Sequence, residues 1–205
     1  SYQHRFRKEA QSLYHCRQKL GQIYAAKASA TRTNGVPSWG TFTDLAQQGG
    51  GALLDIGSHA LDLTLWVMDN WEPESVFCQT FSKLHNLEGI EESAFAMLRM
   101  KNGAVVSLEA AWDLYTDDPR PCAVEFYGTQ GGATLGCPIQ HGNAVYDQPF
   151  APLCDQGVYL AEARAWLNSI LCDTQPPVPV DQALIETRII NAMYRSAAIG
   201  ESVCL

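Results

Sequence analysis

The chain has 205 residues, 46% of them hydrophobic and 18% charged, so it can bury a sizeable core and is not a disordered tail. Fourteen basic against twenty-two acidic residues give a formal net charge of -8, which argues against a general affinity for nucleic acid or an anionic membrane. No apolar run approaches the ~18 residues that a membrane span needs, and no glycine-rich nucleotide-binding motif of the G-x-G-x-x-G or Walker type occurs.

Seven cysteines occur at wide spacings, in an odd number and without a Cys-x-x-Cys motif. Secreted disulfide frameworks are usually denser and even-numbered, so this pattern favours reduced thiols and a cytoplasmic protein. The chain begins at Ser1 without a methionine or a signal segment, which is typical of a piece cut from a longer polypeptide. All seven cysteines are interpreted as buried or inert thiols: Cys16, Cys78, Cys122, Cys137, Cys154, Cys172 and Cys204.

Hydrophobic periodicity predicts the first elements in chain order. A helix is expected over about 7–20, ended by a glycine, followed by a strand over 22–32. Residues 33–48 form a predicted loop that is long enough to suggest a working role. The glycine triplet at 49–51 opens a second predicted helix that runs to about residue 68.

The second half of the chain begins with clustered strands and ends with helices. Strands are predicted over 75–84, 91–100, 104–114 and 122–127, with shorter ones over 133–135 and 143–146, and helices over 161–171 and 181–198. Lys101-Asn102-Gly103 is a hairpin signal between two of the strands. Strands joined by tight turns predict an α+β fold, in which helices pack on one face of a predominantly antiparallel, open β-sheet.

The most informative stretch is GGGALLDIGSHALDLTLW at 49–66. Asp55, His59 and Asp62 stand at i, i+4 and i+7, which predicts that they share one helical face. A carboxylate one turn from an imidazole can fix its tautomer and raise its basicity, as general acid–base chemistry requires. On spacing alone, such a face is more often a solvated or hydrogen-bonded helix surface than an active centre. A zinc site ranks lowest, because no further His or Cys stands at ligand spacing, and no metal is predicted.

Four segments carry a family resemblance: QHRFRKEA at 3–10, LGQIY at 20–24, the pattern GGG-x-x-x-D-x-G-x-H-x-x-D at 49–62, and NAMYRSAAIGESV at 191–203. With these segments in this order, the chain resembles the C-terminal, substrate-side domain of the glucose-fructose oxidoreductase / inositol dehydrogenase (Gfo/Idh/MocA) family. The resemblance implies one substrate-binding and oligomerisation domain over 1–205, with a junction helix over 1–21. It also implies a Rossmann domain that would precede Ser1 and is absent from this chain.

The resemblance further implies hydride transfer between NAD or NADP, bound mainly by the missing domain, and a hydroxyl carbon of a sugar or cyclitol. Carried over to this sequence, His59 and Asp55 form the acid/base pair and Asp62 is a further polar substrate contact. Arg5, at the domain junction, becomes a candidate cofactor contact. The fragment alone is expected to be inactive, because it lacks a hydride acceptor.

Weaker candidate substrate contacts lie in or beside the predicted loops, since a polyol site needs several oriented donors and acceptors. An ordinary loop or packing role fits each of them about as well: Arg32, Trp39, Tyr115 and Arg120. The other histidines have no acidic partner at useful spacing and are interpreted as surface or packing residues, the last being the strongest exception: His4, His15, His85 and His141.

Two other functions remain open. One is assembly without catalysis, because an uncovered sheet face can pair subunits into a dimer or tetramer. Val76, Phe95, Met97 and Leu108 are expected on the two faces of that sheet. The resembled family also includes glycosidases that use a bound NAD. The expected partners are a sugar or polyol and further copies of the chain, with neither nucleic acid nor membrane.

Overall fold

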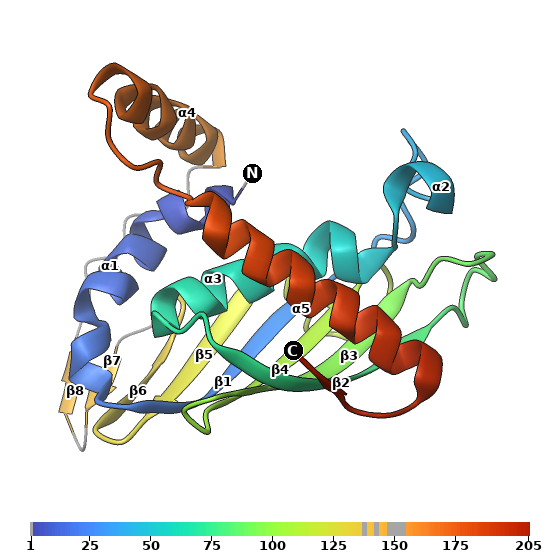
Figure 1. Cartoon of the computed structure of the whole chain (residues 1–205), viewed down its shortest axis with the longest axis horizontal. Coiled ribbons are helices and arrows are strands. Elements are labelled where there is room, and N and C mark those ends of the chain that lie inside the picture. Colours follow the sequence, from blue (N-terminus) through green and yellow to red (C-terminus); the bar gives the residue numbers. More distant parts are fainter. Residues whose placement is uncertain (1, 137–138, 142–143, 147–154) are drawn as a thin grey trace.

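One open sheet with helices across one of its faces organises the molecule (Figure 1). The computed structural model describes residues 2–136, 139–141, 144–146 and 155–205. Within these residues, nine strands pair in the order β8-β7-β6-β5-β1-β4-β3-β2-β9, and every pair except β1 with β4 is antiparallel. The α+β fold class and the predominantly antiparallel open sheet are therefore confirmed.

The strands follow the predicted ranges closely. Short β7 and β9 are additions, because two or three residues show too little alternation to be recognised. The bounds are β1 (Ile23–Thr31), β2 (Pro73–Phe81), β3 (Ser93–Met100), β4 (Val105–Ala111), β5 (Ala123–Gly128), β6 (Gly131–Thr134), β7 (Ile139–His141), β8 (Ala144–Tyr146) and β9 (Val203–Cys204).

The helices differ from the prediction at four places. The expected helix over 7–20 is divided among η1, α1 and η2, and the expected helix over 49–68 begins with a π-helical turn, η3. The short helix α2 lies in the predicted loop over 33–48, and α4 begins at Asp155 rather than at 161. The bounds are η1 (Gln3–Phe6), α1 (Lys8–Cys16), η2 (Arg17–Leu20), α2 (Leu45–Gln48), η3 (Leu53–Gly57), α3 (Ser58–Met68), α4 (Asp155–Leu171) and α5 (Val180–Ile199). Among these helices, none has the length and apolarity needed to cross a membrane.

The parallel pairing of β1 with β4 brings together the loops that follow these two strands. The carboxyl ends of parallel strands lie at the same edge of a sheet. Here the Arg32 amide donates to the Ala111 carbonyl (3.0 Å), and the Leu114 amide donates to the Arg32 carbonyl (3.0 Å). The loops that follow the two strands therefore start side by side, although about 80 residues of chain separate them.

Alternation along the strands divides the sheet into a core face and an open face. Val76 and Leu108 are buried beneath the helices, whereas Phe95 and Met97 lie on the uncovered side and are exposed. This matches the expectation that these residues belong to the two faces of the sheet. The open face consequently presents large apolar side chains to its surroundings.

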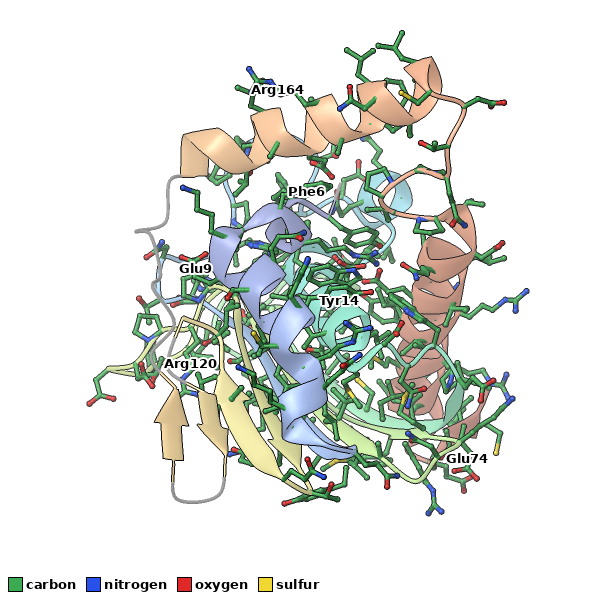
Figure 2. All side chains as sticks on the ribbon, turned by 90° about the vertical axis from the view of Figure 1, so that its left-hand side faces the viewer. Phe6, Glu9, Tyr14, Glu74, Arg120 and Arg164 are labelled. Carbon is green, nitrogen blue, oxygen red and sulfur yellow. The ribbon has the colours of Figure 1, made fainter. Side chains whose placement is uncertain are left out.

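Helix α4 lies apart from the sheet. It crosses the N-terminal helices, and Figure 2 shows it above Phe6 with Arg164 on its outer side. The Tyr2 amide donates to the Glu162 carboxylate on α4 (3.0 Å). Several large apolar side chains of α4 stay exposed: Tyr159, Leu160, Trp166, Leu167, Ile170 and Leu171.

Candidate active site

The π-helical turn η3 places Asp55 at the entrance of α3. Its wider turn adds a residue relative to a regular α-helix, and such turns are frequent at functional sites. Asp55 accepts a hydrogen bond from the Trp112 indole nitrogen (2.8 Å), just beyond the end of β4. His59 borders a cavity, whereas Asp62 is buried beside Arg5, so these residues of the motif have different surroundings.

The glycine triplet before η3 is explained by close approach of another part of the backbone. A Cβ on Gly51 would lie 1.9 Å from the Glu91 carbonyl oxygen, and one on Gly50 would lie 2.2 Å from the Tyr194 hydroxyl. The buried Glu91 carboxylate accepts from the Gly51 and Leu53 amides (3.0 Å each) and from the Tyr194 hydroxyl (2.8 Å). This carboxylate therefore satisfies amides at the start of the helix that carries Asp55 and His59.

Replacing Gly51 by alanine is expected to lower the free energy of unfolding by about 1–3 kcal/mol, because the added methyl overlaps backbone that cannot rotate away. Denaturant unfolding measures the change. Gly157→Ala is the matched control, since Gly157, like Gly51, has no positive φ, and an added Cβ there would meet nothing within 4 Å. A loss for Gly51→Ala no larger than that of the control would contradict the close approach.

His59 is half-buried at the edge of a cavity of about 240 Å³. The Tyr2 and His4 rings meet the imidazole edge-on, with centroids 6.3 and 5.5 Å away. Its buried Nδ1 has no hydrogen-bond partner within the described residues. The cavity is lined by residues from η3, α3, α5 and the segment before η1: Tyr2, Leu54, Ser58, His59, Thr187, Ile190 and Asn191.

The surroundings of His59 favour a neutral imidazole. Burial lowers the pKa of His59 below its ordinary 6.5, the Arg32 cation lowers it further, and the nearby Asp55 carboxylate raises it. Burial and the neighbouring His59 also lower the pKa of His4 to about 4. An unprotonated ring nitrogen at neutral pH can accept a proton from a ligand hydroxyl.

Arg5 and Asp62 form an ion pair in the interior. Arg5 Nε donates to both Asp62 carboxylate oxygens (3.1 and 2.9 Å), and its terminal nitrogen reaches Oδ1 at 2.5 Å. The two side chains are only 2% and 1% exposed. The predicted cofactor contact of Arg5 and substrate contact of Asp62 are corrected accordingly, because each charged group is occupied by the other and neither reaches a surface.

The four weaker candidates separate into different places. Arg32, half-buried at the end of β1, has no side-chain hydrogen bond or ion pair within the described residues, and its charge reaches His59. Trp39 and Tyr115 are 65% and 91% exposed. Arg120 pairs with Asp118 and Glu125 and borders a groove on the open face of the sheet. Arg120 is therefore corrected: it lies on the opposite side of the sheet from His59.

Several residues of the site could not be predicted from the sequence. Tyr2, His4, Thr187 and Asn191 come to His59 from distant segments, and no spacing rule links them to it. Trp112 is buried in the core, and its indole nitrogen donates the hydrogen bond that holds Asp55.

Two further expectations about side chains are revised. His85, expected to lack an acidic partner, pairs with Asp113 (2.9 Å), which follows another strand. Burial raises the pKa of Cys78 to about 12 and that of Cys122 to about 11, which fits inert thiols, but Cys172 and Cys204 are exposed. Cys137, Cys154 and the side chain of His141 lie outside the described residues.

The described residues contain no group of three His, Cys, Asp or Glu side chains that could hold a metal ion. For NAD or NADP the residues present are also insufficient by themselves, because the sequence has no glycine-rich loop to bind a pyrophosphate. The polar groups around His59 instead fit a small molecule with several hydroxyl groups.

Known proteins resemble this chain in sequence. Residues 15–134, more than half of the chain, match the GFO/IDH/MocA C-terminal domain. D-glucoside 3-dehydrogenase of Escherichia coli (strain K12) is 28% identical over 220 residues, which cover 98% of this chain and 63% of that protein. This chain thus spans less than two thirds of the relative's length.

Solved structures share the fold. An aldose-aldose oxidoreductase from Caulobacter crescentus, complexed with glycerol, has a TM-score of 0.85 at 22% identity, covering 100% of this chain and 63% of that one. An oxidoreductase from Agrobacterium radiobacter, in complex with NAD+, L-tartaric acid and magnesium, has a TM-score of 0.80 at 17% identity, covering 100% and 64%. The matched family and the shared fold agree with the motif around His59: this chain belongs to the GFO/IDH/MocA family and corresponds to its C-terminal domain.

Proposed function

We propose that this chain is the substrate-side domain of an NAD(P)-dependent oxidoreductase that acts on a hydroxyl carbon of a sugar or cyclitol. The observation that carries the proposal is the His59 imidazole, held neutral at the edge of a cavity, with the charges of Asp55 and Arg32 nearby. The similarity to a D-glucoside 3-dehydrogenase and to an aldose-aldose oxidoreductase supports a sugar as the substrate class.

The residues of this chain would handle the proton. His59 accepts the proton of the substrate hydroxyl while the hydride leaves the same carbon, which becomes a carbonyl. The negative charge of Asp55 stabilises the imidazolium that forms, and Arg32 can donate hydrogen bonds to neighbouring hydroxyl groups. When bound, the nicotinamide supplies the hydride acceptor. In the reverse direction, His59 returns the proton to the carbonyl oxygen.

The exposed apolar side chains of helix α4 are evidence that another domain covers this helix in the whole protein. Six large apolar side chains on one helix exceed what a soluble surface usually leaves open, and exposed apolar patches mark contact sites. Because the relatives are longer and the matched family domain is a C-terminal one, we infer that the nucleotide-binding domain covers this helix. The chain by itself is then expected to be inactive.

Spectrophotometry of cofactor reduction tests the proposed function. The whole protein, incubated with NAD+ or NADP+ and a panel of glucosides, aldoses and inositols, is expected to reduce the cofactor with at least one of them, and the 205-residue chain with none. No turnover by the whole protein on any member would contradict the proposal. Cleavage of a glucoside without net cofactor reduction would favour the glycosidase alternative.

Self-association through the open sheet face is the second candidate function. On β2 and β3, Phe77 pairs across the strands with Met97, and Phe81 meets Phe95 edge-on with ring centroids 6.1 Å apart. All four side chains are exposed. An apolar, uncovered sheet surface of this kind fits a second copy of the same surface in a dimer or tetramer.

Replacing both Phe77 and Met97 by lysine is expected to convert the oligomer of the whole protein into a monomer, because two charges would be buried without partners. Light scattering after size-exclusion chromatography measures the mass. Leu184→Lys is the control, since Leu184 is exposed on α5, away from the open face. Wild-type protein that is monomeric at high concentration, or a double variant that stays oligomeric, would count against this interface.

A further inference from the structure

Glu186 is an ionisable residue in the interior that the proposed chemistry does not use. It lies on α5, its side chain is 0% exposed, and neither carboxylate oxygen has a hydrogen bond of normal geometry within the described residues. A buried carboxylate without a partner is very costly, so such a group normally takes up a proton.

The charges around Glu186 leave it without a counterion. The segment before η1 contributes Tyr2, η1 contributes Arg5, and α3 contributes Asp62. Arg5 directs its Nε and one terminal nitrogen to Asp62 and the other terminal nitrogen to the Gln182 side chain (2.8 Å). Two buried carboxyl groups thus share one guanidinium that is already committed to Asp62.

Helix α4 contributes a further carboxylate near this cluster, because Glu162 accepts a hydrogen bond from the Tyr2 amide (3.0 Å). Burial and the Asp62 carboxylate raise the pKa of Glu186 to about 9. Burial and the neighbouring Glu186 raise the pKa of Tyr2. At neutral pH the Glu186 side chain is therefore a neutral carboxylic acid.

This acid is connected to the candidate active site. Tyr2 lies between the two, because its side chain neighbours Glu186 while its ring lines the cavity and meets His59 edge-on. Thr187, the next residue on α5, lines the same cavity. Ionisation of Glu186 would therefore disturb two walls of the His59 cavity, the one formed by Tyr2 and the one formed by the first half of α5.

We propose that Glu186 is a positioning residue, which as a neutral acid holds Tyr2 and α5 in place around the His59 cavity, and that its ionisation sets an alkaline limit on the integrity of this site. The effect on activity rests on the proposed function of His59. The effect on stability does not, because it depends only on the burial of the carboxyl group.

Thermal unfolding of the whole protein between pH 5 and 9.5 tests the burial directly. The unfolded chain loses the Glu186 proton near an ordinary pKa of 4.5, whereas the folded chain retains it to about pH 9. Wild-type stability should therefore fall with rising pH relative to Glu186→Gln, whose amide cannot ionise. The difference in Tm is expected to be small at pH 5 and to grow by several degrees by pH 9.

Asp181→Asn is the matched control, because Asp181 is an exposed carboxylate on the first turn of the same helix. Its Tm is expected to keep a constant offset from the wild type. A Tm difference between Glu186→Gln and wild type that is equally independent of pH would overturn the proposal.

The pH profile of kcat/KM tests the link to the site. Above pH 9 the wild type should lose activity, Glu186→Gln should retain it to a higher pH, and Glu186→Ala should lose kcat at every pH. Identical alkaline limbs for the wild type and Glu186→Gln would overturn the positioning role. A wild type without turnover on any substrate would count against the proposed function instead, while the Tm comparison would still decide the state of Glu186.

Discussion

Replacing Asp62 by alanine is expected to lower the free energy of unfolding by about 3–5 kcal/mol, as is typical when one partner of a buried ion pair is removed. The substitution would leave the Arg5 guanidinium, 2% exposed, without its carboxylate hydrogen bonds, although the Gln182 amide oxygen and the Glu186 carboxyl group would remain beside it. Equilibrium denaturation of the whole protein measures the loss. The pair also joins η1 to α3, so part of the loss should appear as release of the N-terminal segment from α3.

Two variants make the Asp62 result interpretable. Glu74→Ala breaks the exposed pair with Arg99 and is expected to cost about 1 kcal/mol or less. The double variant Arg5→Met/Asp62→Leu is expected to recover much of the loss, since apolar side chains of similar size can replace a buried pair. An Asp62→Ala loss as small as that of Glu74→Ala would mean that the pair is not desolvated.

Replacing His59 by glutamine in the whole protein is expected to lower kcat about 10²–10⁴-fold, the usual contribution of a general base. Glutamine has a similar size and polarity but cannot accept the proton at neutral pH. Stability should change little, since His59 is half-buried and its Nδ1 makes no hydrogen bond within the described residues. Cofactor reduction, measured on whichever substrate the panel identifies, gives the rate.

His15→Gln is the matched control for that measurement. His15 is exposed on α1, and its ring contacts the Gln11 carbonyl of the preceding turn and the Tyr14 ring. Its replacement is expected to leave kcat unchanged. Full activity of His59→Gln, or equal losses in the two variants, would remove His59 from the proton transfer.

Alternation and periodicity predict the layers of this fold because they report which face of each element is buried. They fail where burial comes from partners distant in the chain. The π turn at η3 is an example: the spacing of Asp55 and His59 fits a regular helix, and only the packing of η3 against β4 changes it. Gly57, where an added Cβ would lie 2.9 Å from that of Ala110, permits that packing.

The difference between the predicted substrate contact of Asp62 and its buried ion pair has the same cause. Its position in the motif resembles a substrate contact, but its fate depends on Arg5, 57 residues earlier. The glycine triplet also depends on a distant residue. The sequence marks it as the start of a helix, and its close approach to another part of the backbone arises because Glu91 comes from the segment before β3. Sequence motifs point to the candidate site, while long-range contacts determine the surroundings of each residue in it.

A crystal structure of the whole protein with cofactor and a sugar substrate bound would test the role of His59 directly. A His59 ring nitrogen is expected to lie about 2.6–3.2 Å from the hydroxyl oxygen on the carbon that is oxidised, as proton transfer requires. A substrate whose reacting hydroxyl lies beyond hydrogen-bond distance of His59, with another residue of the protein in contact with it, would show that His59 is not the general base.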